Sequence, residues 1–180
     1  MGNEIVRWKV EPIERARGLD ERLLIAAPRL LRLVAYCLRR PAGSRLRRVV
    51  ITRLLQVGLA ANNRGDYKAL STGLHPNVEL HFDVEGAPPG FEGVHRGRDG
   101  YIHALIAWKE SFGENRWEPR EIFDPGGTRF GYRNELVARG TGSGVELRRQ
   151  EFYACELEDG VLRRQWFAAN QDGMLRLLGQ

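Results

Sequence analysis

The sequence has only two cysteines in 180 residues, Cys37 and Cys155, and neither belongs to a C-x-x-C pair. Both lie in apolar stretches, which predicts free buried thiols rather than a disulfide framework or a zinc site. Long apolar runs are also absent, because no segment approaches the roughly 20 apolar residues of a membrane-spanning helix. The N-terminus has no apolar signal core either. We therefore expect a soluble, cytoplasmic protein whose core forms without disulfides.

Acidic residues are scarce in the first part of the chain. Residues 1–53 contain 13 Arg and Lys against 5 Asp and Glu, whereas residues 54–180 contain 15 against 18. A basic excess of this kind is typical of proteins that bind nucleic acids or anionic membranes. Arginine outnumbers lysine by 25 to 3, however, which points to codon composition, and no RNP, KH or zinc-finger signature is present. A nucleic-acid or membrane partner is therefore disfavoured.

Helical patterns dominate the first third of the sequence. Residues 19–40 carry apolar side chains at helical spacing, and Pro28 can begin a second helical piece within them. Ser44 can cap a further helix that runs to about residue 63. The basic amphipathic stretch within residues 1–45 is interpreted as a structural arm that packs on its own domain, and an acidic membrane is the alternative partner.

Strand patterns take over after residue 66. Val78, Leu80 and Phe82 alternate with polar residues, as in a half-buried strand. Gly and Pro dominate residues 85–93, which predicts a loop, and a third helix is predicted over about residues 98–112. Helices followed by an antiparallel meander predict an α+β fold. The four strands of the meander are predicted at about residues 117–124, 128–140, 145–157 and 161–169.

Four short motifs follow one another in a distinctive order. They are N-R-G-D-Y-K-A-L, H-P-N-V-E-L-H-F, G-V-H-R-G-R-D-G-Y and L-E-D-G-V-L-R-R. Over residues 46–180 this order resembles the SnoaL-like branch of the nuclear transport factor 2-like (NTF2-like) superfamily, which leaves residues 1–45 as an N-terminal helical extension. The resemblance implies a cone-shaped α+β barrel, in which a strongly curved, mostly antiparallel sheet packs on three helices around a cavity. It also implies homodimers that form through the sheet.

Three charged residues are candidates for catalysis. Asp83 lies where a strand gives way to the Gly/Pro loop, at the expected mouth of the cavity, and is a candidate general base. The alternative for Asp83 is a solvated loop aspartate. Arg149 and Glu151 occupy an otherwise apolar strand face, where buried charges must be paired. Glu151 is thus a candidate acid or base of the pocket, and an ion pair at a dimer face is its alternative role.

Aromatic and polar side chains on the expected inner faces are candidates for ligand binding. Asn134 could orient a ligand carbonyl, and Trp166 is also interpreted as a core residue. No histidine spacing matches a metal site and no dinucleotide or phosphate-binding signature occurs, so we expect neither a metal nor a cofactor. The predicted ligand-binding set consists of Phe82, Tyr101, Trp108, Asn134, Tyr153 and Trp166.

Two functions fit this sequence. One is a cofactor-free lyase or isomerase, of the cyclase, isomerase or dehydratase kind, that performs general acid/base chemistry on a small, largely apolar carbonyl compound. The other is a non-catalytic ligand-binding or dimerisation module of the same fold. Ketosteroid isomerase activity is disfavoured, because that chemistry needs an oxyanion-hole tyrosine from the first long helix and residues 46–63 contain no tyrosine.

Overall fold

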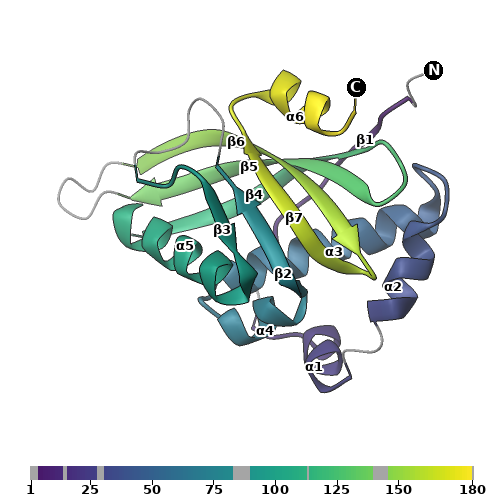
Figure 1. Ribbon diagram of the computed structural model, residues 1–180, viewed down its shortest axis with the longest axis horizontal. Helices are drawn as coiled ribbons and strands as arrows, with labels where there is room; N and C mark the ends of the chain where they lie inside the picture. The colour runs from purple at the N-terminus through teal and green to yellow at the C-terminus, as the bar shows by residue number, and fades with distance from the viewer. Residues whose placement is uncertain are drawn as a thin grey trace.

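A strongly curved, open sheet forms the body of the molecule (Figure 1). The computed structural model describes residues 4–13, 16–27, 31–82, 90–112, 114–139 and 146–179. Within these residues the sheet has seven strands in the order β1-β4-β5-β6-β7-β2-β3. Neighbouring strands are antiparallel, except that β2 and β7 are parallel. The strands are β1 (Val6–Lys9), β2 (Leu74–His81), β3 (Val94–Arg96), β4 (Glu114–Asp124), β5 (Arg129–Arg139), β6 (Glu146–Glu158) and β7 (Val161–Ala168).

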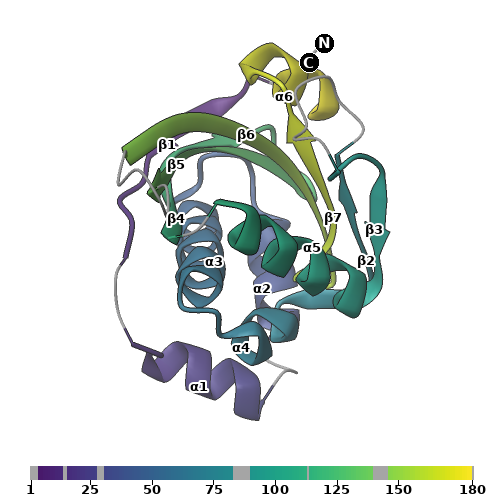
Figure 2. The same ribbon diagram turned by 90° about the vertical axis from the view of Figure 1, so that its left-hand side faces the viewer.

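Helices lie on both sides of this sheet. Figure 2 shows α3 and α5 inside the curve of the sheet, with α2 beside them, and α6 on the convex side. The helices of the described residues are α1 (Leu19–Ala26), α2 (Leu31–Leu38), α3 (Arg45–Asn63), α4 (Tyr67–Thr72), α5 (Gly97–Phe112) and α6 (Gln171–Leu177). The α+β class predicted from the sequence is confirmed, although the sheet stays open between β1 and β3.

The main hydrophobic core fills the concave side. Ile51 of α3, Trp108 of α5 and Tyr132 of β5 are buried in one cluster. Because side chains alternate along a strand, every second residue of β5 faces these helices. Register shifts interrupt β4 between Pro119 and Glu121 and also interrupt β6. Such bulges increase the local twist of a strand, and they help the sheet to wrap around the helices.

The N-terminal segment is part of the same packed unit. Strand β1 pairs with β4, and the Trp8 indole donates a hydrogen bond to Thr52 Oγ1 of α3 at 2.9 Å. Arg17 pairs with Asp66, the N-cap residue of α4, at 2.7 Å. The two predicted helical pieces of residues 19–40 correspond to α1 and α2. Strand β1 was not predicted, because a strand of four residues is too short to show an alternating pattern.

A buried ion pair ties α3 to the turn between β4 and β5. Arg47 and Asp124 are 1% and 0% exposed, and Arg47 Nη2 lies 2.7 Å from Asp124 Oδ1. Arg47 Nη1 also donates to the carbonyl oxygens of Leu38 and Gly127. Asp124 in turn accepts from the backbone N–H of Gly126 at 2.9 Å. One residue pair therefore joins the end of α2, the start of α3 and the β4–β5 turn.

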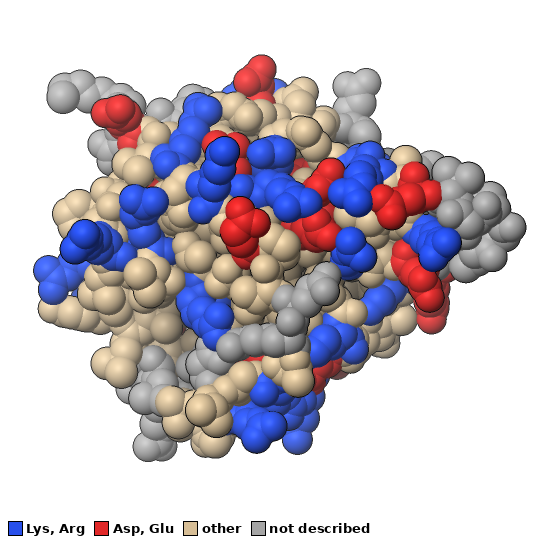
Figure 3. Space-filling view, turned by 180° about the vertical axis from the view of Figure 1, so that it is seen from behind, with Lys and Arg blue, Asp and Glu red and all other residues tan. Residues whose placement is uncertain are grey.

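Charges of both signs share the rear surface of the molecule. Figure 3 shows Lys and Arg interspersed with Asp and Glu on the face opposite to that of Figure 1. On β4 and β5, for example, Arg120 pairs with Glu135 at 2.6 Å and Arg133 pairs with Glu121 at 3.5 Å. In addition, none of the described helices has the length and apolar character needed to cross a membrane.

Candidate ligand cavity and its buried carboxylate

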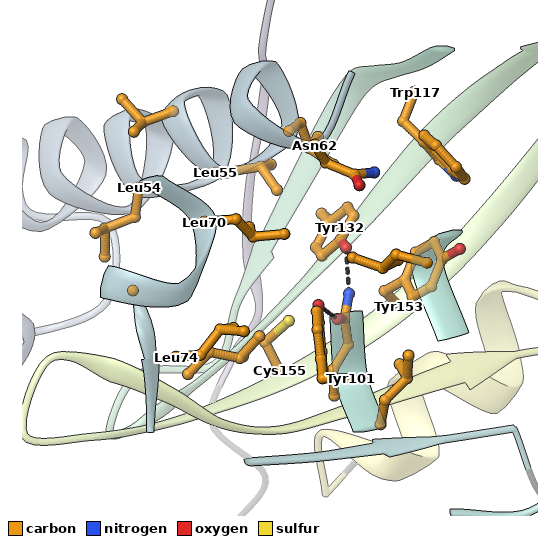
Figure 4. Close-up of a pocket in the computed structure, with 18 of the residues that line it drawn as sticks. Leu54, Leu55, Asn62, Leu70, Leu74, Tyr101, Trp117, Tyr132, Tyr153 and Cys155 are labelled. Atoms are coloured by element: carbon orange, nitrogen blue, oxygen red, sulfur yellow. Dashed lines mark hydrogen bonds between the residues drawn. The ribbon is translucent and has the colours of Figure 1, made fainter. Parts of the chain in front are cut away.

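A largely apolar cavity of about 170 Å³ lies between the concave face of the sheet and helices α3, α4 and α5 (Figure 4). Leucines of the helices form much of its wall, among them Leu54, Leu55 and Leu70. Strands β5, β6 and β7 supply the polar groups on the opposite side. An apolar cavity of roughly 150 Å³ is large enough to bind benzene. This cavity can therefore hold a small ring compound.

Three polar residues of the cavity wall are hydrogen-bonded to one another. The hydroxyl group of Tyr101 donates to Gln165 Oε1, and Gln165 Nε2 donates to the hydroxyl oxygen of Tyr132 at 2.5 Å (Figure 4). Burial raises the pKa of both tyrosines above their usual value, so both hydroxyls keep their protons. These two hydrogen bonds fix the positions of three side chains, which come from α5, β7 and β5.

Glu151 is a buried carboxylate at the side of the cavity. It is 1% exposed, and its Oε2 accepts hydrogen bonds from Trp117 Nε1 at 3.0 Å and from the Tyr153 hydroxyl at 2.9 Å. Both donors line the cavity, whereas Glu151 lies behind them. Burial raises the pKa of Glu151 above its ordinary 4.5, and the hydrogen bond from Tyr153 and the charge of Arg149 oppose this shift. The hydrogen bonds to Trp117 and Tyr153 place Glu151 on the inner face of the sheet, behind the cavity wall.

Arg149 accompanies Glu151 on the same strand face. Its Nη2 lies 3.3 Å from Glu151 Oε1, and its side chain is 36% exposed. The guanidinium group lies over the rings of Trp108 and Phe167, at 5.9 and 5.6 Å from their centroids. Planar guanidinium groups are favoured at such stacked sites. Arg149 therefore connects the buried carboxylate to the surface of the molecule.

The structure brings most of the predicted site residues together. Glu151 and Arg149 lie 3.3 Å apart as an ion pair, and Asp83 lies outside the described residues. Five of the six predicted ligand-binding residues line the cavity, namely Phe82, Tyr101, Trp108, Asn134 and Tyr153.

Trp166 is the exception among the predicted ligand-binding residues. Its ring stacks on His81 at 5.4 Å, and the guanidinium group of Arg129 lies over it at 5.9 Å. Trp166 packs with the cluster on the convex side of the sheet, so it does not contact the cavity. Its neighbours Gln165 and Phe167 are the β7 residues that face inward. Each face of β7 carries a large aromatic residue, Trp166 on one and Phe167 on the other. The alternation of side chains along the sequence therefore does not show which face lines the cavity, and the prediction for Trp166 was wrong.

Sequence reasoning missed two polar groups in the cavity wall. The predicted ligand-binding set includes Trp166, and because side chains alternate along a strand, this choice placed the neighbouring Gln165 on the outer face of β7. Asn62 lies near the end of α3, and no pattern in the sequence distinguishes it from an asparagine that ends a helix. Both residues are buried, at 6% and 5% exposed, and both line the cavity. The alternation of β7 around Phe167 is the signal that could have found Gln165.

Helix α2 contributes one residue, Leu31, to the cavity wall. Leu31, at the start of α2, is buried and lines the cavity together with Leu74 and Leu162. Gly160, in the turn between β6 and β7, has a φ of +83°, and a Cβ atom there would lie 2.2 Å from the carbonyl oxygen of Leu31. A side chain at position 160 is thus incompatible with the observed place of α2. The N-terminal segment therefore contributes directly to the cavity.

Among the residues that the structure describes, no group of three or more His, Cys, Asp or Glu side chains could hold a metal ion. The polar side chains that line the cavity are instead amides, phenols, indoles, one threonine and one cysteine. These groups suit hydrogen bonding to a neutral ligand.

Comparisons with known proteins give the fold. No family model and no curated protein sequence matches this chain. Among solved structures, TerC, crystallised with polyporic acid, matches with a TM-score of 0.57 and 20% identity over 71% of this chain and 97% of TerC. An NTF2-like protein of unknown function from Burkholderia pseudomallei K96243 matches with a TM-score of 0.56 and 20% identity, over 71% of this chain and 96% of that one.

A third structure agrees with these two. IdmH from Streptomyces antibioticus, a candidate polyketide cyclase, matches with a TM-score of 0.54 and 18% identity, over 72% of this chain and 98% of IdmH. Identities in this range establish shared architecture and do not transfer an activity. The chain has the NTF2-like fold, in agreement with the SnoaL-like resemblance of its sequence motifs.

Proposed function

We propose that this protein binds a small, largely apolar carbonyl compound in the cavity and transfers a proton on it without a cofactor, as a lyase or isomerase of the polyketide-cyclase type. The observation that carries this proposal is the buried carboxylate of Glu151, which is hydrogen-bonded to the cavity-lining hydroxyl of Tyr153. Two solved structures of the same fold support it. TerC was crystallised with the small molecule polyporic acid, and IdmH is a candidate polyketide cyclase.

The proposed chemistry is a proton relay. Tyr153 donates its hydroxyl proton to Glu151 while the tyrosine oxygen takes a proton from the carbon next to the ligand carbonyl. Burial raises the pKa of Tyr153, so a free phenolate is disfavoured and the two transfers occur together. The negative charge moves to the ligand oxygen, where an N–H of the Asn134 amide can donate to it. Glu151 is then the general base and Tyr153 the group that touches the substrate.

Ligand binding without catalysis is the second candidate. It is favoured by the position of Glu151, which does not itself line the cavity and lies behind Trp117 and Tyr153. The homodimer through the sheet, the cytoplasmic location and a role for Asp83 at the cavity mouth remain predictions in either case.

The exchange of α-protons separates the two candidates. We expect the protein to accelerate the exchange of the C2 protons of 1-indanone with D₂O, as followed by ¹H NMR. Glu151→Gln and Tyr153→Phe should each slow the catalysed exchange by about 10²-fold or more, since general bases contribute 10²- to 10⁴-fold. Because the carboxylate is the active form and its pKa is raised, the rate should rise with pH over a range above 4.5.

The control for this experiment is Glu158→Gln, which removes a carboxylate that is 55% exposed and lies near the β6–β7 turn. This variant should exchange 1-indanone at the wild-type rate. Binding of 1-indanone with no acceleration of exchange in the wild type would leave the non-catalytic candidate. Equal exchange rates for the wild type and Glu151→Gln would remove Glu151 as the base.

A further inference from the structure

Two carboxamides in the cavity wall have polar atoms without a hydrogen-bond partner among the described residues. Asn134, in the middle of β5, is 0% exposed, and neither its Oδ1 nor its Nδ2 has a hydrogen-bond partner among the described residues. Asn62, near the end of α3, is 5% exposed, and its Oδ1 also lacks one. Both residues line the cavity. Figure 4 shows the Asn62 carboxamide directed from α3 toward the side where Tyr132 and Trp117 lie.

Unused polar atoms in a buried position are costly. A buried donor or acceptor without a partner costs about 1–3 kcal/mol relative to its hydrated state. Native proteins therefore satisfy nearly all such groups, and each exception requires an explanation. The other amide of the wall, Gln165, is engaged at both ends by Tyr101 and Tyr132. Asn134 is thus the central amide of the wall that remains available to a ligand.

The chemistry of a carboxamide determines what would satisfy it. Its NH₂ group only donates hydrogen bonds and its oxygen only accepts them. The two ends of an asparagine exchange places when the amide is flipped, but both ends of Asn134 are unused, so the requirement is the same in either orientation. A partner must offer one acceptor and one donor close together. A plain ketone offers only the acceptor, and a hydrocarbon offers neither.

We infer that the ligand of this cavity carries a hydrogen-bond donor beside its carbonyl group, as in a lactam or a hydroxy-carbonyl compound, and that Asn134 selects for this pair. The inference rests on the proposed function in that the cavity binds a carbonyl compound. A lactam places its N–H and C=O side by side and can form two parallel hydrogen bonds with the carboxamide. Asn62 lines the same cavity and supplies a second acceptor. The remainder of the ligand is apolar, since the surrounding wall is formed by leucine and aromatic side chains.

Three bicyclic probes of the same shape test this inference. Indane has neither group, 1-indanone has the acceptor alone, and isoindolin-1-one has the acceptor and the donor. Their dissociation constants are measured by NMR titration of the full chain, for the wild type and for Asn134→Leu. Leucine has the same branching and the same number of side-chain heavy atoms as asparagine, and it removes both polar atoms. Removal of a buried, unpaired polar group does not endanger folding, and a urea unfolding curve of the variant verifies this.

The decisive quantity is the change that the substitution causes, because it cancels the different hydration of the probes. We expect Asn134→Leu to weaken the binding of isoindolin-1-one at least about tenfold more than that of 1-indanone, and to leave indane unchanged or more tightly bound. Equal weakening of isoindolin-1-one and 1-indanone would overturn the inference and leave the proposed function intact. Binding of none of the three probes to the wild type would remove the proposed function itself.

Discussion

Replacement of Arg47 by methionine is expected to lower the free energy of unfolding by about 3–5 kcal/mol, the cost of removing one partner of a buried ion pair. The variant leaves Asp124 buried and without its cation. It also removes the donors to the carbonyl oxygens of Leu38 and Gly127, which hold α2 and the β4–β5 turn against α3. Urea denaturation followed by circular dichroism measures the change.

Arg45→Met is the matched control, since Arg45 is an exposed residue of the same helix. We expect this variant to stay within about 0.5 kcal/mol of the wild type. The double variant Arg47→Met, Asp124→Leu removes both charges and should recover part of the loss. Full recovery is not expected, because the backbone N–H groups of Gly43 and Gly126 lose their acceptor. A loss below about 1 kcal/mol for Arg47→Met would contradict the structural role of the pair.

Replacement of Gly160 by alanine has the second large effect, and it acts on the cavity. The new Cβ atom would lie 2.2 Å from Leu31 O and 3.1 Å from Ala35 N, so α2 must move away from the β6–β7 turn. Leu31 then leaves the cavity wall. We expect a loss of stability of at least about 2 kcal/mol, from positive-φ strain together with the displacement of α2. We also expect faster amide hydrogen exchange in α2 and weaker binding of the ring probes.

Gly65→Ala separates backbone strain from the displacement of α2. Gly65 has a φ of +69°, and a Cβ atom there meets nothing within 4 Å. This variant should therefore cost only about 1–2 kcal/mol, the penalty of the left-handed conformation. Hydrogen exchange in α2 should remain at the wild-type rate. If Gly65→Ala and Gly160→Ala behave alike in α2, then contact with the turn does not hold this helix.

The sequence predicts the inward-facing residues of a long strand when only one face of that strand packs on the core. The alternation through Phe130, Tyr132, Asn134 and Leu136 assigns Asn134 to the core side, because polar and small residues separate these positions. Glu151 stands out in the same way, as the single carboxylate on a mainly apolar face of its strand. In both strands one face is mainly apolar and the other mainly polar, so the alternation indicates which face is covered.

Other parts of the site depend on contacts that no local pattern contains. Arg47 is one of 25 arginines, and its partner Asp124 is 77 positions away. The hydrogen bond between Trp117 and Glu151 likewise joins residues 34 positions apart. Strand β7 is covered on both faces, which made the choice between Trp166 and its neighbours ambiguous. The role of α2 as a cavity wall follows from its contact with Gly160, and the helical pattern of residues 19–40 does not imply it.

The most direct test of the central claim is the place where a carbonyl compound binds. Intermolecular NOEs between 1-indanone and the protein, measured by isotope-filtered NMR, report this place. We expect NOEs to the methyl group of Ala104 and to the rings of Tyr132 and Tyr153, which line the cavity, together with a shift of the Trp117 indole N–H signal. NOEs confined to exposed side chains such as Leu33 or Val49, with no contact to these cavity residues, would contradict the claim that the cavity is the ligand site.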